Sequence, residues 1–364
     1  MLPKITGPEF FIGRGSDPST ALGASDLISF GSGQPDLPPP REAYDILKDF
    51  KGFKYGLVQG DVSLRTALSK LHPGTNPDEF VITNGASEAI DLALRSIAQP
   101  GARVLMARPY YYSYPRNVEL AGMTPVYVDL DKNGKIPFED FEREVRTCRA
   151  VIINSPSNPT GTVQDVETLK KIESLCDELG VYILSDEVYK DLIYVRGNYP
   201  LHGERVITLD SFSKTYAMCG LRVGFLHSPD MSLIQKVIEM KSHTAMNTSI
   251  VGQAMALAAL GSPESYMVNY KKVWIERRDM MYQGLKDLGL DVWKPEGAFY
   301  LLPKFKESGR VVHDLYYNYQ MITYDGAWFG APGRVRFSYA LDVQKIQEGM
   351  RRLKKFLETE YRVY

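Results

Sequence analysis

The chain has 364 residues, which is enough for two domains with a shared interface and too many for a small disulfide-stabilised module. Its 43 Lys and Arg nearly balance its 44 Asp and Glu, so no excess charge favours a nucleic acid or an anionic membrane as a partner. Hydrophobic residues make up 44% and charged residues 24%, values typical of a globular protein and not of a disordered or fibrous chain.

The first 45 residues are rich in Gly, Pro and Ser and show no helical period. We therefore expect an extended arm that packs against another part of the protein. The N-terminus lacks the basic start and apolar segment of a signal peptide, and no apolar run approaches the roughly 18 residues of a spanning helix. Three widely spaced cysteines form no metal-binding motif. These features predict a cytoplasmic protein without a metal site.

Seven short apolar segments alternate with helical patterns in the middle of the chain. The predicted strands are 80–83, 103–107, 125–130, 150–154, 181–185, 206–209 and 222–226. Most are apolar throughout, which is typical of strands that are covered on both faces of a parallel sheet. Amphipathic periods over 86–98 and 166–180 predict crossover helices. We predict an α/β fold whose large domain has a mainly parallel seven-stranded sheet flanked by helices.

The C-terminal part has a mixed pattern. A long charged helix is predicted up to about residue 288, followed by the strand-like segment GAFYLL, a Tyr-rich stretch and the segment VRFSYA. An amphipathic helix over 343–360 closes the chain. We expect a large domain over 46–284 and a smaller α/β domain over 285–364, to which the arm over 1–45 contributes.

Phosphate-binding signatures for nucleotides are not found. Two G-x-G segments, at 13–15 and 31–33, lack the third glycine of the dinucleotide fingerprint. The G-x-x-x-x-G-K-[ST] motif does not occur anywhere in the sequence. The sequence therefore gives little support to a dehydrogenase or a P-loop enzyme.

Polar residues instead follow several predicted strands, at the sheet edge where open α/β folds bind their ligands. The run N-G-A-S at 84–87 opens a helix, where free backbone N–H groups can bind an anion. The run N-P-T-G at 158–161 predicts a rigid turn that directs Asn158. Each run alone is more typical of a helix cap or a plain turn than of a site.

Two charged residues stand at strand ends. Asp186 ends an apolar strand, where a buried carboxylate needs a cationic partner, either a structural Arg or a bound cationic ring. Lys214 lies in S-F-S-K-T-Y directly after the strand V-I-T-L-D, in a position that suits an amine nucleophile. A lone lysine in a loop would more often be an exposed side chain.

The ordered set N-G-A-S, N-P-T-G, S-D-E-V-Y and S-F-S-K-T-Y-A-M-C-G-L-R-V-G-F resembles the class I and II aminotransferases. These are pyridoxal 5′-phosphate (PLP) enzymes of fold type I. The resemblance extends from about Gly33 to the C-terminal helix. Four motifs in the family's order make chance similarity improbable, whereas one motif would carry little weight.

The resemblance implies a role for each matching residue. Lys214 forms the internal Schiff base with PLP, and Asp186 pairs with the pyridine nitrogen of the cofactor. Asn158 and Tyr189 hydrogen-bond the phenolic oxygen of the cofactor, and Tyr111 occupies the position of an aromatic residue that stacks on its ring. The implied phosphate site consists of Gly85, Ala86, Ser87, Ser211, Ser213 and Arg222.

The resemblance also implies a substrate site and a dimer. Arg336 matches the arginine that binds the substrate α-carboxylate, and Gly33 matches a glycine whose backbone approaches that group. Tyr55 matches a tyrosine that reaches the cofactor phosphate of the neighbouring subunit, which implies a homodimer. We expect that Phe11, Arg14 and Tyr324 contribute to the pocket for the substrate side chain.

The reaction implied is transfer of an amino group from an L-amino acid to a 2-oxo acid, by a ping-pong mechanism through the Lys214 aldimine. Other chemistries of fold type I remain open at this point, namely those of a β-lyase, a decarboxylase or a cyclase. A non-catalytic regulator module would need a fused DNA-binding segment or a basic face, and the balanced charge of the chain disfavours it. The donor amino acid does not follow from the motifs.

Overall fold

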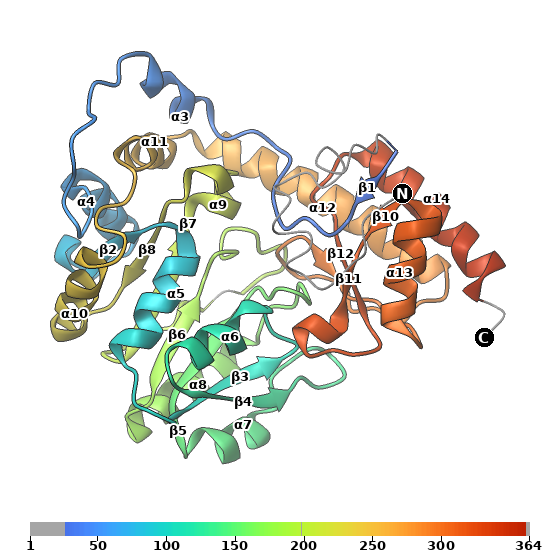
Figure 1. The fold of residues 1–364 in the computed structure, drawn as a ribbon, viewed down its shortest axis with the longest axis horizontal. Helices are drawn as coiled ribbons and strands as arrows, with labels where there is room; N and C mark the ends of the chain where they lie inside the picture. The colour runs from blue at the N-terminus through green and yellow to red at the C-terminus, as the bar shows by residue number, and fades with distance from the viewer. Residues whose placement is uncertain (1–25, 198, 362–364) are drawn as a thin grey trace.

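The computed structural model describes residues 26–197 and 199–361. Figure 1 shows a large sheet with helices on both sides and a second group of helices and short strands that contains the C-terminal segment. The expected residues Phe11 and Arg14 lie outside the described residues. In the described part of the chain, no helix is long and apolar enough to cross a membrane.

The large sheet has seven strands in the order β2-β8-β7-β6-β5-β3-β4. All neighbours are parallel except β8, which pairs antiparallel with both β2 and β7. This confirms the predicted mainly parallel seven-stranded sheet. The strands are β2 (Phe80–Thr83), β3 (Arg103–Arg108), β4 (Thr124–Asp129), β5 (Cys148–Asn154), β6 (Tyr182–Asp186), β7 (Val206–Ser211) and β8 (Gly224–His227).

Helices bury both faces of this sheet, which explains why its strands are apolar throughout. Successive strand residues point to opposite faces, so Ile152 and Val151 enter two separate cores. One core includes α5 (Gly85–Ser96), α6 (Ser113–Leu120) and α10 (Met231–Ser242), and the other includes α7 (Phe138–Val145) and α8 (Val166–Leu179). Gly180 ends α8 in the left-handed conformation, which glycine adopts without steric cost.

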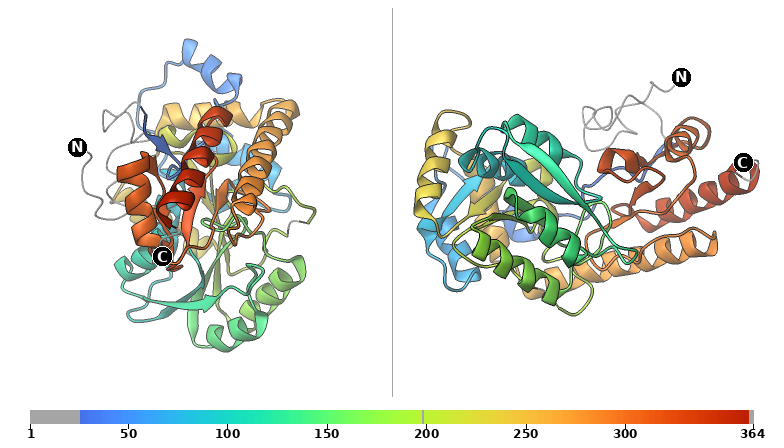
Figure 2. Two further views of the ribbon diagram at one scale, coloured as in Figure 1. Left: turned by 90° about the vertical axis from the view of Figure 1, so that its right-hand side faces the viewer. Right: turned by 90° about the horizontal axis from the view of Figure 1, so that it is seen from below.

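The C-terminal part of the chain forms a further core. Three antiparallel strands, β9 (Tyr300–Leu301), β12 (Val335–Ser338) and β11 (Tyr324–Asp325), pack with three helices. These helices are α12 (Glu264–Asp287), α13 (Ser308–Tyr319) and α14 (Val343–Thr359). Figure 2 shows that α12 runs from the large sheet along this second group.

The arm before α4 (Val62–Leu71) is only partly extended. Its strand β1 (Ile28–Ser29) pairs in parallel with β10 (Met321–Ile322), so the start of the described chain joins the C-terminal part. Contrary to the expectation of a wholly extended arm, a short helix, α3 (Arg41–Asp45), forms before residue 45. Ala43 of this helix is buried in one core with Ala256 and Ala259 of α11 (Ile250–Leu260), a tertiary environment that the local sequence does not show.

Candidate active site

A cavity of about 370 Å³ lies at the carboxyl ends of the parallel strands, between the large sheet and the arm. Of the expected site residues that the structure describes, all but Gly85 and Tyr55 line it. Those that line it are Gly33, Ala86, Ser87, Tyr111, Asn158, Asp186, Tyr189, Ser211, Ser213, Lys214, Arg222 and Arg336. Tyr324, expected in the side-chain pocket, also lines it. Residues more than 300 positions apart in the sequence therefore meet in one place.

Lys214 projects into the cavity from α9 (Phe212–Thr215), a single helical turn directly after β7. The Ser211 side chain caps this turn by accepting from the Ser213 backbone N–H at 3.3 Å. The Lys214 amine donates to the Gly33 carbonyl oxygen and lies 3.9 Å from Cys219 Sγ. Burial disfavours the Lys214 cation, but electrostatic interactions with Cys219, Tyr300 and Tyr111 outweigh burial and raise the Lys214 pKa.

Asp186 ends β6 and is buried in the cavity wall. Its Oδ2 accepts a hydrogen bond from the Tyr114 hydroxyl, and its Oδ1 accepts from the Val188 backbone N–H at 3.3 Å. Burial raises the Asp186 pKa to about 6, although both hydrogen bonds act in the opposite direction. From the sequence, we expected a structural Arg or a bound cation beside Asp186. The side chain that hydrogen-bonds Asp186 in the structure is Tyr114, which the sequence analysis did not single out.

The turn after β5 aligns Asn158. The Asn154 Oδ1 accepts from the Asn158 backbone N–H at 2.9 Å, while the Asn154 Nδ2 donates to the Asp186 carbonyl at 3.0 Å. Gly161 has φ of +70°, and a Cβ there would lie 2.8 Å from the Tyr300 carbonyl oxygen. Asn154 thus joins the ends of β5 and β6 and holds both Asn158 and Asp186 at the cavity.

Arg336, on β12, is buried at the opposite side of the cavity. Its Nη1 donates to the Asn158 Oδ1 at 3.0 Å and its Nη2 to the Gly31 carbonyl at 2.5 Å. The guanidinium carbon also lies 4.6 Å from the ring centres of Tyr300 and Tyr324. In the described part of the chain, the buried Arg336 Nε has no hydrogen-bond partner. A fixed, partly unsatisfied guanidinium suits an anionic ligand such as a carboxylate.

The start of α5 and Arg222 bring a second group of hydrogen-bond donors to the cavity. The Arg222 guanidinium donates to the Cys219 carbonyl at 3.0 Å and to the Asn84 carbonyl at 3.2 Å. Gly85 has φ of +75°, and a Cβ on it would lie 2.5 Å from the Arg222 Nη2. Gly85 therefore makes room for Arg222 instead of lining the cavity. The backbone N–H groups of Ala86 and Ser87 lie at the positive end of α5.

The arm is tied down next to the cavity. Arg277 of α12, nearly buried, donates to both carboxylate oxygens of Asp36 at 2.6 and 3.1 Å. This paired contact holds the segment that contains Gly31 and Gly33, whose carbonyl oxygens accept from Arg336 and Lys214.

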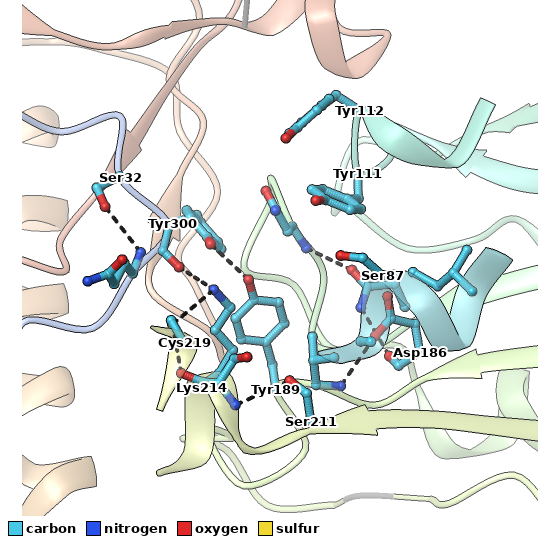
Figure 3. A pocket seen from close by; sticks show the side chains of 18 of the residues that line it. Ser32, Ser87, Tyr111, Tyr112, Asp186, Tyr189, Ser211, Lys214, Cys219 and Tyr300 are labelled. Atoms are coloured by element: carbon cyan, nitrogen blue, oxygen red, sulfur yellow. Dashed lines mark hydrogen bonds between the residues drawn. The ribbon is translucent and has the colours of Figure 1, made fainter. Parts of the chain in front are cut away.

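Sequence reasoning missed Tyr300, which is 1% exposed and lines the cavity. The segment GAFYLL predicted a strand. Its hydrophobic pattern did not indicate that Tyr300 faces the cavity. Figure 3 shows Tyr300 and Tyr189 on one side of Lys214. A Cβ on Gly33 would lie 2.6 Å from the Tyr300 hydroxyl, so the absence of a side chain at Gly33 permits this approach.

Tyr55 does not reach the cavity of its own chain. Its side chain is 85% exposed, and it lies beside Phe53, which is 81% exposed. Together with 245–247 and 250–251, these residues line a shallow surface groove. No group of His, Cys, Asp or Glu in the described residues could hold a metal ion.

Comparisons with known proteins agree with this geometry. The family model "Aminotransferase class I and II" matches residues 25–353. A probable aspartate/prephenate aminotransferase of Aquifex aeolicus is 34% identical over 92% of this chain and 91% of the relative. Aromatic-amino-acid aminotransferase 2 of Thermococcus litoralis is 32% identical over 93% of both chains. The crystal structure of an aspartate aminotransferase from Thermotoga maritima superposes with a TM-score of 0.89 at 31% identity, covering 98% of both chains.

Proposed function

The chain belongs to the class I and II aminotransferases, PLP-dependent enzymes of fold type I, and we propose that Lys214 carries its amino-transfer reaction. The observation that supports this assignment most is the position of the Lys214 amine. It lies in one cavity with the buried Asp186 carboxylate and the buried Arg336 guanidinium. The substrates are an amino acid and a 2-oxo acid, and the same residues serve both in turn.

The residues in the cavity fit PLP. We assign its phosphate to the Ala86 and Ser87 N–H groups, the Arg222 guanidinium, and the Ser211 and Ser213 hydroxyls, because these donors surround the positive end of α5. The tight packing of Arg222 against Gly85, where a Cβ has no room, supports a built anion site.

The ring of the cofactor is assigned to the residues farther along the strand ends. Asp186 pairs with the pyridine nitrogen and stabilises its protonated form, because a buried carboxylate favours a cationic partner. Asn158 and Tyr189 donate to the phenolic oxygen, and the Tyr111 ring covers one face. When bound, PLP supplies an aldehyde that reacts with amines and a ring that withdraws electrons from the substrate α-carbon.

The protein performs the remaining tasks with its own groups. Arg336 binds the substrate α-carboxylate, and the nearby Gly33 leaves space for it. The Lys214 Nζ would take up the proton of the substrate α-carbon and hold it for return during the transfer. Because its pKa is raised, Lys214 must lose a proton before it can act as a base or a nucleophile.

We assign the exposed Tyr55 to the cofactor phosphate of a second copy of the chain. Its ring is too exposed for an aromatic side chain packed within one subunit, and it lies beside the exposed Phe53. A symmetric dimer would cover both residues and bring Tyr55 to the partner's cavity.

The experiment that tests the assignment of Lys214 combines absorption spectroscopy with product analysis. We expect the purified protein with PLP to show a visible absorption band that an amino-acid donor removes and a 2-oxo acid restores. Lys214→Ala should lose the band and all turnover above background. Lys294→Ala, which removes an exposed amine, is the matched control and should retain both.

Two results would contradict the proposal. A Lys214→Ala protein with an unchanged band and undiminished turnover would show that another amine reacts with the cofactor. Turnover of an amino acid without any 2-oxo acid would identify a lyase or a decarboxylase instead of an aminotransferase.

A further inference from the structure

The contact between Tyr114 and Asp186 assigns a task to a residue outside the set with implied roles. We propose that Tyr114 is a positioning residue whose hydroxyl keeps Asp186 ionised and correctly oriented for the pyridine nitrogen of PLP. This inference rests on the proposed function of Asp186. Its starting point is a buried hydrogen bond between α6 and the end of β6, 72 residues apart in the sequence.

The direction of this hydrogen bond is fixed by the chemistry of the two groups. Tyr114 is 2% exposed, and burial together with the charge of Asp186 raises the pKa of its hydroxyl well above the ordinary value. The hydroxyl therefore keeps its proton at any working pH and donates a hydrogen bond to Asp186 Oδ2. A donor to a carboxylate stabilises the ionised form of that carboxylate.

Asp186 depends on this donor because its surroundings otherwise disfavour its charge. Burial raises its pKa to about 6, the nearby Asp210 acts in the same direction, and Lys214 acts against it. Of the groups that lower this pKa, the Tyr114 hydroxyl has the largest effect, followed by the Val188 backbone N–H. The other titratable groups near Asp186 are Glu187 and Tyr189. Loss of the Tyr114 hydroxyl would therefore raise the Asp186 pKa further.

The geometry also fixes the orientation of the carboxylate. The Tyr114 hydroxyl binds one oxygen of Asp186 and the Val188 N–H binds the other, so the plane of the group cannot rotate freely. A carboxylate has about four acceptor positions, which leaves positions for a ligand in the cavity. The Tyr114 ring is held in turn by an edge-on contact with the Tyr111 ring, with centres 5.4 Å apart.

The test is the pH dependence of PLP affinity in Tyr114→Phe, measured by titrating the apoprotein with PLP. Without the hydroxyl, Asp186 should require a higher pH to ionise. We expect the pH midpoint of tight binding to rise by about one unit, which corresponds to roughly tenfold weaker binding on the acid side of the midpoint. At alkaline pH the affinity of the variant should approach that of the wild type.

A matched control is Tyr127→Phe. Tyr127 lies on β4, stacks on Tyr110 with ring centres 5.3 Å apart, and does not line the cavity. Loss of the Tyr127 hydroxyl should leave both the affinity for PLP and the pH midpoint of tight binding unchanged. Ring-fluorinated tyrosine at position 114, a stronger donor of the same shape, should shift the midpoint in the opposite direction from Tyr114→Phe.

If Tyr114→Phe weakened PLP binding equally at every pH, Tyr114 would only pack against the site. An unchanged pH midpoint in both Tyr114→Phe and the protein with fluorinated tyrosine at position 114 would also overturn the inference. If the proposed function itself were wrong, the wild-type protein with PLP would show no visible absorption band that depends on Lys214. That result distinguishes failure of the proposed function from failure of this inference. In that case the Tyr114 variants would have no binding curve to compare.

Discussion

The Tyr300 hydroxyl lies 2.8 Å from the Tyr189 hydroxyl, and the Tyr300 ring covers the Arg336 guanidinium, whose central carbon is 4.6 Å from the ring centre. One buried side chain therefore contacts both the residue assigned to the phenolic oxygen of PLP and the residue assigned to the substrate carboxylate. Tyr300 couples the two halves of the site, although it comes from the C-terminal part of the chain and Tyr189 from the turn after β6.

Tyr300→Phe keeps the ring over Arg336 and removes the hydrogen bond to Tyr189. We expect kcat/KM to fall by a factor of about 5 to 10, because a buried hydrogen bond of this kind contributes about 1 kcal/mol. Tyr300→Leu also removes the ring, so the KM for the amino acid should rise further. Steady-state kinetics with both variants separates these effects.

The control for Tyr300 is Tyr339→Phe. Tyr339 is equally buried in the same core, and its hydroxyl donates to the Ala298 carbonyl at 3.0 Å, away from the cavity. This change should lower stability by about 1 kcal/mol and leave kcat/KM nearly unchanged. Equal kinetic losses in the two phenylalanine variants would show that Tyr300 acts only through the stability of the core.

Gly224→Ala should separate β8 from the start of α5. A Cβ at Gly224 would lie 2.6 Å from the Asp210 carbonyl oxygen, 2.7 Å from the Gly85 carbonyl carbon and 2.9 Å from the Ala86 nitrogen. Because all three are backbone atoms, the assigned phosphate site must shift. We expect roughly tenfold weaker PLP binding and about 1 to 3 kcal/mol lower stability, measured by titration and by denaturant unfolding.

Gly220→Ala is the matched control for this change, since a Cβ at Gly220 would have no atom within 4 Å. The control protein should bind PLP like the wild type. Unaltered PLP affinity in Gly224→Ala would place the phosphate away from the start of α5.

The exposed Phe53 provides a test of the proposed dimer. Phe53→Glu places a charge in the apolar surface that also contains Tyr55, so it should shift a dimer towards monomers. Sedimentation should show this shift, and PLP affinity should fall with it because Tyr55 is assigned to the partner's phosphate site. Leu120→Glu, at another surface position with 59% exposure, should change neither the sedimentation behaviour nor the affinity for PLP. A wild-type protein that sediments as a monomer would refute the dimer.

His72 should make the stability of the protein depend on pH. Lys190 Nζ donates to its Nε2 at 3.1 Å, so its Nδ1 carries the proton and donates to the Leu68 carbonyl at 2.8 Å. Burial and the Lys190 charge lower its pKa from 6.5 to about 4. The unfolded chain therefore binds the extra proton first, and stability falls as pH drops from about 6.5 towards 4.

The full effect of His72 amounts to about 3 kcal/mol by the linkage relation, reached near the lower limit of this range. His72→Gln keeps a hydrogen-bond acceptor but cannot titrate. The stability difference between wild type and variant, measured by urea unfolding, should shrink as the solution is acidified. A difference that stays constant over this range would show that His72 titrates alike in both states.

The class of fold and most of the residues that line the cavity could be predicted from the sequence. Continuous apolar strands such as 150–154 and 206–209 require helices on both faces, and this physical need predicts a parallel sheet without any knowledge of distant contacts. The polar runs at the strand ends carry the family's motifs, because the geometry of the parallel sheet brings strand ends together at one edge. Lys214 and Asp186 could therefore be named from sequence.

The surroundings of Lys214 and Asp186 follow from the packing of distant parts of the chain and could not be predicted. Tyr114 and Tyr300 look like ordinary packing residues in the sequence, and their hydroxyls meet Asp186 and Tyr189 because separate elements pack at the same cavity. Ala43 of the helix α3 in the arm is likewise buried in one core with residues of α11. Such contacts join residues tens to hundreds of positions apart, so neither periodicity nor a local motif encodes them, and packing of the whole chain is what fixes them.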